Sequence, residues 1–170
     1  MRILLFLPAL LLLVSCHQEK ETQPANSLNW EKRKVTIPLP DSLFSGRSYL
    51  SVYSEIYDLT EETKHQLTST VSIRNTSLSD SLFITQANYY NTEGNLIRSY
   101  VETPIYLTPL ETLEIVIHRR DSTGGSGANF IFEWATKNAT YEPLFEAVMI
   151  WTTGNQGISF VTRGKNFPFN

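Results

Sequence analysis

A glycine-rich loop between two extended segments is the part of this sequence whose residue types are best suited to chemistry. It holds three glycines within four positions, with an acidic residue before them and an amide after them: Asp121, Gly124, Gly125, Ser126, Gly127 and Asn129. Glycines let the backbone fold tightly and expose N–H groups, which can cradle an anion. The same residues are also typical of a tight connection between strands, in which Asp121 or Asn129 bonds to local backbone. The sequence leaves both interpretations open.

Familiar catalytic and metal-binding motifs do not fit this loop. Residues 124–128 superficially resemble the G-x-S-x-G nucleophile elbow, but that elbow needs a following helix, whereas residues 130–134 alternate as a strand does. No Lys-Ser or Lys-Thr pair closes the loop as in a P-loop, and Asp121 alone supplies too few oxygen ligands for calcium. The three histidines have no cysteine or carboxylate at ligand spacing. We therefore predict no catalytic set, no metal site and no cofactor.

Three tyrosines form a second candidate surface. Tyr49, Tyr53 and Tyr57 stand four residues apart in a segment, 48–58, that is predicted to be one strand. Alternate residues of a strand share a face, so the three rings would form one stripe. A tyrosine offers a flat apolar body with a polar tip, which suits stacking on sugars or a protein interface. The simpler interpretation is that these rings pack at the edge of a sheet while their hydroxyls meet water.

The segments that must position these residues are predicted to be strands. The clearest is 67–74, where Leu67, Val71 and Ile73 point one way and polar residues point the other. Similar alternation occurs at 82–90, 96–101, 113–117, 130–134, 147–152 and 158–162, with turn-forming residues between these segments. Together with 48–58 this makes about eight strands. Residues 35–170 are therefore predicted to form an all-β domain, an immunoglobulin-like antiparallel β-sandwich.

The start of the chain predicts export and a lipid anchor. Residues 1–15 combine a basic Arg2 with an apolar run that is shorter than the roughly 20 residues needed to span a membrane, which is typical of a cleaved signal peptide. Residues 13–16, Leu-Val-Ser-Cys, resemble the lipobox of bacterial lipoproteins, which implies cleavage before Cys16 and a diacylglyceryl group on its thiol. His17 follows in place of aspartate, and this resembles the outer-membrane pattern of Gram-negative lipoproteins. Residues 16–34 are predicted to be a flexible tether.

The cysteine count and the charge narrow the possible kinds of domain and of binding partner. Cys16 is the only cysteine, so no disulfide can form within the domain and its core must hold it together. Without residues 1–15 the chain carries 13 basic and 17 acidic residues, and its longest basic run is residues 32–34. Binding to nucleic acid depends on clustered Lys and Arg that neutralise phosphates, so a nucleic-acid partner is not expected.

Several stretches resemble the DUF3124 family of bacterial proteins. They are Tyr49–Tyr57 (YLSVYSEIY), Ser72–Thr76 (SIRNT), Tyr89-Tyr90 with Gly94, Gly124–Phe130 (GGSGANF), Glu146–Ile150 (EAVMI) and Gln156–Phe160 (QGISF) with Arg163-Gly164. The resemblance covers residues 46–164. It implies a shared fold and a setting in the cell envelope, and it implies no activity.

Two functions are compatible with these sequence features. The first is a non-enzymatic binding or assembly module of the cell envelope, attached to the membrane through Cys16 and presenting a sheet face or loop end to an envelope protein or a glycan. The second is a small-ligand binder or enzyme centred on the loop from Gly124 to Asn129, with Asp121 and Arg163 as charged contributors. The sequence does not decide between them.

Overall fold

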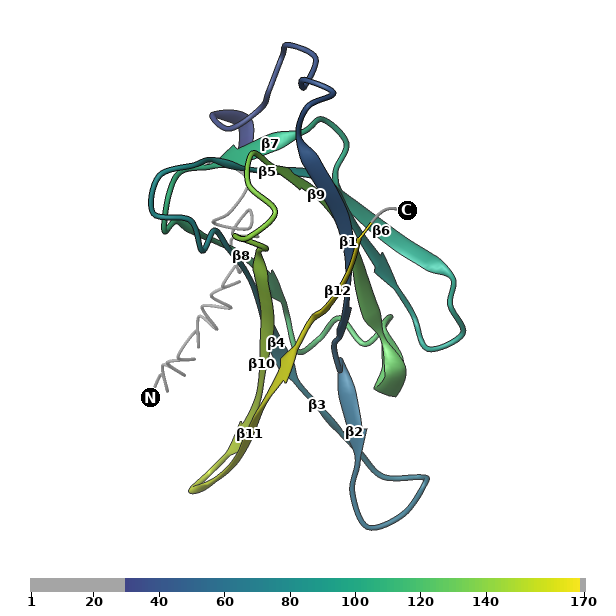
Figure 1. Ribbon diagram of the computed structural model, residues 1–170. Helices are drawn as coiled ribbons and strands as arrows, with labels where there is room; N and C mark the ends of the chain where they lie inside the picture. Colours follow the sequence, from purple (N-terminus) through teal and green to yellow (C-terminus); the bar gives the residue numbers. More distant parts are fainter. Residues whose placement is uncertain (1–29, 169–170) are drawn as a thin grey trace, which may run out of the picture.

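The structure, a computed structural model that describes residues 30–168, is a sandwich of two antiparallel sheets (Figure 1). The predicted signal peptide 1–15, Cys16 and most of the predicted tether lie outside the described residues. The larger sheet has the order β12-β1-β9-β5-β6, with β7 also paired to β5, and the smaller sheet has the order β11-β10-β4-β8. A separate hairpin joins β2 to β3. The strands are β1 (Phe44–Ser51), β2 (Glu55–Tyr57), β3 (Lys64–Gln66), β4 (Thr68–Arg74), β5 (Leu82–Tyr90), β6 (Leu96–Val101), β7 (Ile105–Leu107), β8 (Thr112–Ile117), β9 (Asn129–Thr136), β10 (Leu144–Thr153), β11 (Gln156–Arg163) and β12 (Lys165–Pro168).

The predicted antiparallel β-sandwich is confirmed. Of the twelve strands in the described residues, eight have six residues or more, and these correspond to the eight segments predicted from alternation. The other four strands have three or four residues, which is too short to show a period of two. One predicted strand is wrong in its extent. Residues 48–58 are divided between β1 and β2, because β1 ends at Ser51 and β2 begins at Glu55.

A column of stacked aromatic rings joins the two sheets. Phe132 of β9 stacks on Phe130 of the same strand at 5.3 Å between ring centroids, and on Phe145 of β10, in the opposite sheet, at 4.3 Å. Tyr89 of β5 extends the column, with its ring 4.8 Å from that of Phe130. All four rings are buried. Large buried aromatic groups contribute strongly to a core, so this column stabilises a domain in which no disulfide is available.

The two long edges of the sandwich are built differently. At one edge the chain passes directly from β11 in the smaller sheet to β12 in the larger sheet. Here Gly164 N–H donates to Phe145 O at 2.8 Å and Thr162 Oγ1 donates to Ser51 O at 2.6 Å. At the other edge the outermost strands are β6 and β7, which both pair with β5 in the larger sheet, and β8 in the smaller sheet; among the described residues no ladder pairs β8 with β6 or β7. We call these the closed edge and the open edge.

Residues 30–34 belong to the folded domain, which corrects the predicted boundary at residue 35. Arg33 forms an ion pair with Glu111 at 2.6 Å, and both side chains are less than a quarter exposed. Lys34 makes an isolated β-bridge with Ile105, and Tyr106 N–H donates to Arg33 O at 3.0 Å. The hydrogen bond from Arg33 lowers the pKa of Glu111 although partial burial opposes this, so the carboxylate stays charged at neutral pH. The predicted tether is therefore wrong for residues 30–34.

Two hairpins extend from one end of the sandwich (Figure 1). One is β2–β3, and the other is the far end of β10–β11, which turns at residues 153–156 with Gly154 at a φ of 56°. The β2–β3 hairpin is held by an ion pair between Lys64 and Glu55, and the Lys64 ammonium lies 4.9 Å from the centre of the Tyr57 ring. The two hairpins therefore place short polar segments beyond the core.

The aromatic column yields the first prediction. Phe132→Ala should lower the free energy of unfolding by about 3–5 kcal/mol, because it removes a buried ring and leaves a cavity between two others. Phe44→Ala is a matched control, since Phe44 is 54% exposed and such a change should stay within about 0.5 kcal/mol. Urea denaturation followed by circular dichroism measures both values. Equal losses for the two variants would contradict the role given to the column.

Candidate functional site

The glycine-rich loop is folded against the turn between β5 and β6. Its middle, Gly125–Gly127, forms a single 3₁₀ turn. Thr92 contacts it three times: Thr92 N–H donates to Gly124 O at 3.0 Å, Thr92 Oγ1 donates to the same oxygen at 3.1 Å, and Gly127 N–H donates to Thr92 Oγ1 at 2.9 Å. Ser54 N–H donates to Gly125 O at 3.1 Å, and Gly125 N–H donates to Ser122 O at the same distance. Two N–H groups of the loop that could donate to an anion, those of Gly125 and Gly127, are therefore already bonded within the domain.

Asp121 also has its partners within this region. Its carboxylate accepts hydrogen bonds from the Thr123 hydroxyl and backbone and from Arg98 of β6 at 3.2 Å. Partial burial alone would raise the pKa of Asp121, but these bonds lower it below the ordinary value. Arg163, the other charged residue considered with this loop, pairs with Glu146 in the smaller sheet. The structure therefore does not bring Asp121 and Arg163 together.

Gly124 is required by packing at this loop. A Cβ atom there would collide with the Tyr89 hydroxyl and come within 2.6 Å of Ser54 Oγ. These two hydroxyls share a buried hydrogen bond of 2.8 Å. Burial raises the pKa of Tyr89 to about 12, although the bond to Ser54 opposes this. The positive φ in this loop belongs to Gly125, at 73°, and Asn129 begins β9. In the same loop Gly127 is exposed and Ser126 is half-buried. The loop is organised by contacts to its own domain, which favours the interpretation that it is a tight connection between strands. Ligand binding there stays a prediction.

The three tyrosines do not form one stripe. Tyr49 lies on β1 and is 39% exposed, and Tyr57 lies on β2 and is 53% exposed. Tyr53 falls between the two strands and packs edge-on against Phe160, with 5.6 Å between ring centroids. The break between β1 and β2 therefore separates the rings into three different surroundings. A partner surface at these residues stays a prediction, but the geometry does not offer the contiguous face from which it was inferred.

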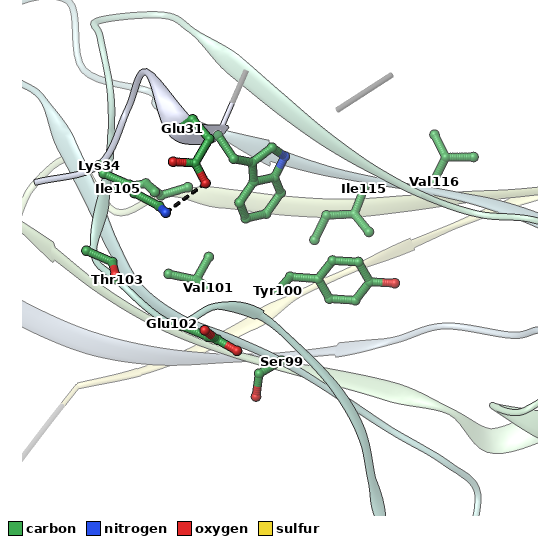
Figure 2. A pocket seen from close by; sticks show the side chains of 11 residues that line it. Glu31, Lys34, Ser99, Tyr100, Val101, Glu102, Thr103, Ile105, Ile115 and Val116 are labelled. Carbon is green, nitrogen blue, oxygen red and sulfur yellow. Dashed lines mark hydrogen bonds and ion pairs between the residues drawn. The ribbon is translucent and has the colours of Figure 1, made fainter. Parts of the chain in front are cut away.

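A pocket of about 380 Å³ lies at the open edge of the sandwich. Its apolar wall comes from β6, β7, β8 and the first described residue: Trp30, Tyr100, Val101, Ile105, Ile115 and Val116. The Trp30 ring is 6.4 Å from that of Tyr100, which in turn lies 5.6 Å from Phe130 of the aromatic column. Figure 2 shows Tyr100, Val101 and Ile115 gathered at the centre. We call this the open-edge pocket.

Charged groups lie only at the rim of the open-edge pocket. Lys34 and Glu31 form an exposed ion pair of 2.7 Å at one side (Figure 2). Glu102 also lines the pocket and is exposed, with no partner among residues 30–168. The rim thus carries two carboxylates and one ammonium group, a net charge of −1 at neutral pH. The charged residues that line the entrance are therefore mostly acidic, and the interior is apolar.

A second cavity, of about 620 Å³, lies between the two hairpins. It is lined by residues of the β2–β3 hairpin and of the far end of β10–β11: Asp58, His65, Trp151, Asn155, Gln156, Gly157 and Ile158. We call it the hairpin cleft. Unlike the open-edge pocket, it is mostly polar and faces away from the core.

Sequence reasoning did not find either cavity. Each is assembled from segments far apart in the chain, so no local pattern marks it. One signal was present: Trp30 is a large apolar residue in a stretch that otherwise reads as a polar tether, and such a residue usually packs against something. Within residues 30–168 no cluster of His, Cys, Asp and Glu is arranged to hold a metal. Nor does that part of the chain contain a helix long and apolar enough to cross a membrane.

The fold and the open-edge pocket define an antiparallel β-sandwich domain with an apolar cavity between its two sheets. The chain belongs to the DUF3124 family, described as protein of unknown function, whose model matches residues 45–167. This confirms the family predicted from the sequence. No curated protein matches the chain. Among solved structures it is similar to the crystal structure of Thermotoga maritima 1070, with 7% identity over 71% of this chain and 92% of that one and a TM-score of 0.42.

Close packing at Gly124 gives a test of the loop. Gly124→Ala should lower the free energy of unfolding by about 1–3 kcal/mol, because the added methyl group meets the Tyr89 and Ser54 hydroxyls. Tyr89→Phe removes one of these hydroxyls, so Gly124→Ala should cost less in that background than in the parent. A double-mutant cycle in urea measures the difference. Additive losses would show that the two residues do not compete for the same space.

Proposed function

We propose that this protein is a membrane-anchored, non-enzymatic binding module of the bacterial cell envelope, and that its domain binds a small apolar ligand in the open-edge pocket. The observation that carries the proposal is the cavity of about 380 Å³ between β6 and β8, which reaches the aromatic core. Its volume lies within the range of about 300–1,000 Å³ that is usual for small-molecule sites. An apolar wall with a few polar groups at the entrance is also typical of such sites.

The open edge explains why a ligand can enter here. Side chains between two sheets are covered at the closed edge by the crossing from β11 to β12, whereas at the open edge the cover is Trp30 and its neighbours. Residues 30–34 are fixed to the domain by the Arg33–Glu111 pair and by one β-bridge. Trp30 can therefore shift with fewer broken contacts than a central strand would need.

The rim selects the kind of ligand. Burying alkyl or ring carbons against Val101, Ile105 and Ile115 releases water and supplies the binding energy, at about 25 cal/mol per Å² of apolar surface. An anionic head group would meet the net negative charge of Glu31, Glu102 and Lys34. The ligand expected here therefore has an apolar body and an uncharged or cationic head.

Membrane anchoring at Cys16 completes the proposal. The 13 residues between Cys16 and Trp30 can span at most about 45–50 Å when fully extended. A domain on such a tether stays near the bilayer surface, where apolar molecules are concentrated. The resemblance of residues 13–16 to a lipobox supports the anchor, and the pattern at His17 supports the outer membrane of a Gram-negative bacterium as its place.

Ligand binding can be measured with the neutral dye N-phenyl-1-naphthylamine and the mature chain carrying Cys16→Ser, which has no lipid. We expect saturable fluorescence enhancement, and we expect decanol to displace the dye at lower concentration than decanoate does. Thr103→Trp should block the dye by placing a ring at the pocket entrance. Glu102→Gln should reduce the preference for decanol over decanoate about two- to threefold, which is the size expected when one exposed charge is removed.

The controls separate the pocket from the rest of the surface. Thr60→Trp adds the same ring on the β2–β3 hairpin, and Glu61→Gln removes the same charge there, so both should leave dye binding unchanged. Binding that is identical in the parent and in Thr103→Trp would exclude the open-edge pocket as the site. No saturable binding of the dye, decanol or decanoate would contradict the proposed ligand class.

The anchor is tested separately in cells. Cys16→Ser should move the protein from the membrane fraction to the soluble or precursor fraction, because the thiol that would carry the lipid is gone. Immunoblots of fractionated Gram-negative cells measure the distribution, and His17→Ala, which keeps the cysteine, is the control. Unchanged membrane fractionation of Cys16→Ser would contradict lipidation at this residue.

A further inference from the structure

The hairpin cleft is separate from the open-edge pocket and has a different chemistry. It lies at the end of the molecule from which β2–β3 and the far part of β10–β11 extend (Figure 1). Its residues play no part in the aromatic column or in the proposed apolar site. Both sides of the cleft are hairpins whose strands are hydrogen-bonded, so the cleft has a defined shape without a ligand.

An aromatic pair forms the floor of this cleft. The rings of Trp151 on β10 and His65 on β3 are 4.2 Å apart between centroids and inclined by 37°. His65 Nε2 lies 3.4 Å from Asp58 Oδ2, so the carboxylate orients the imidazole ring. Trp151 and His65 are each half-buried, and Ile158, opposite Trp151 in the register, is 39% exposed. Trp151 also packs against the core, so the solvent meets the part of the aromatic pair that neither the core nor the contact between the two rings covers.

Polar side chains surround the aromatic pair. Asn155 and Gln156, in and just after the turn of β10–β11, are exposed, and their amides have no hydrogen-bond partner among residues 30–168. Each amide can both donate and accept hydrogen bonds, and the Asp58 carboxylate can accept them. No Lys or Arg lines the cleft, so nothing in it would neutralise a phosphate, sulfate or uronate.

We propose that the hairpin cleft binds an uncharged oligosaccharide. A pyranose ring has an apolar face of C–H groups, which packs on an aromatic ring such as that of Trp151, and an outer ring of hydroxyls, which both donate and accept hydrogen bonds. The amides of Asn155 and Gln156 and the carboxylate of Asp58 match those hydroxyls. The cleft, of about 620 Å³, is open to solvent, so a sugar ring bound in it can belong to a longer chain.

This site would give the protein a second contact in the envelope. The proposed ligand of the open-edge pocket is apolar and small, whereas the hairpin cleft faces away from the core and takes a hydrated polymer. The two sites use no residue in common. Loss of one kind of binding therefore leaves the other measurable.

Saturation-transfer NMR tests the proposal with the mature Cys16→Ser chain and three neutral trisaccharides: chitotriose, maltotriose and cellotriose. We expect transfer to at least one of them, with a transfer effect that saturates as the sugar concentration rises. Trp151→Ala should weaken binding about tenfold or more, in line with the loss of an aromatic stacking partner. Because Trp151 is partly buried, the double variant Asn155→Ala/Gln156→Ala, on the exposed turn, is measured beside it and should also weaken binding with an unchanged melting temperature.

A control variant and two contradicting outcomes complete the test of sugar binding. Thr103→Trp, which alters the open-edge pocket, should bind the trisaccharide as the parent does, so failure of the apolar site and failure of this one are distinguishable. No transfer to any of the three trisaccharides would overturn the proposal. Binding that survives unchanged in both the Trp151 variant and the Asn155/Gln156 variant would overturn it equally, because the sugar would then lie elsewhere.

Discussion

The stacking of four aromatic rings between the sheets is the interaction on which the rest of this domain depends. Phe132 stands between Phe130 and Phe145, and Tyr89 continues the column on the β5 side. With Cys16 as the only cysteine, no disulfide links the two sheets across the core, and the stack of Phe132 on Phe145 is a direct contact between them. Other features involve the same rings. Tyr89 makes the buried hydrogen bond to Ser54 and packs closely against Gly124, and Phe130 lies against Tyr100 in the wall of the open-edge pocket.

The spacing of the sheets is maintained differently at the two edges. At the closed edge the chain itself crosses from one sheet to the other, and the Thr162 hydroxyl of β11 donates to Ser51 O of β1 across this edge. At the open edge the cover is supplied by a short segment whose main polar tie is the Arg33–Glu111 pair. A sandwich built this way has one edge closed by the crossing of the chain and one edge covered by residues 30–34, whose backbone bonds to β7. That asymmetry places the apolar cavity beside β6 and β8.

Alternation of residues was sufficient to predict the long strands, because each of them has one buried and one solvated face. Alternation did not predict structure that depends on a contact between residues far apart in the sequence. β2 and β7 have three residues each, and β7 exists because β5 offers it a partner. Trp30 reads as part of a polar tether until Tyr100, seventy positions later, is placed beside it. The need for glycine at position 124 arises from Tyr89 and Ser54, which no local pattern connects to the loop.

The pairing of β1 has a consequence for how this chain folds. Its two neighbours in the sheet, β9 and β12, are made from residues 129–136 and 165–168. Both sides of β1 are therefore paired only after residues 165–168 have reached the sheet. Contacts of such long sequence separation slow folding, because loop closure must precede them. Full pairing of β1 is therefore a late event in the folding of this domain.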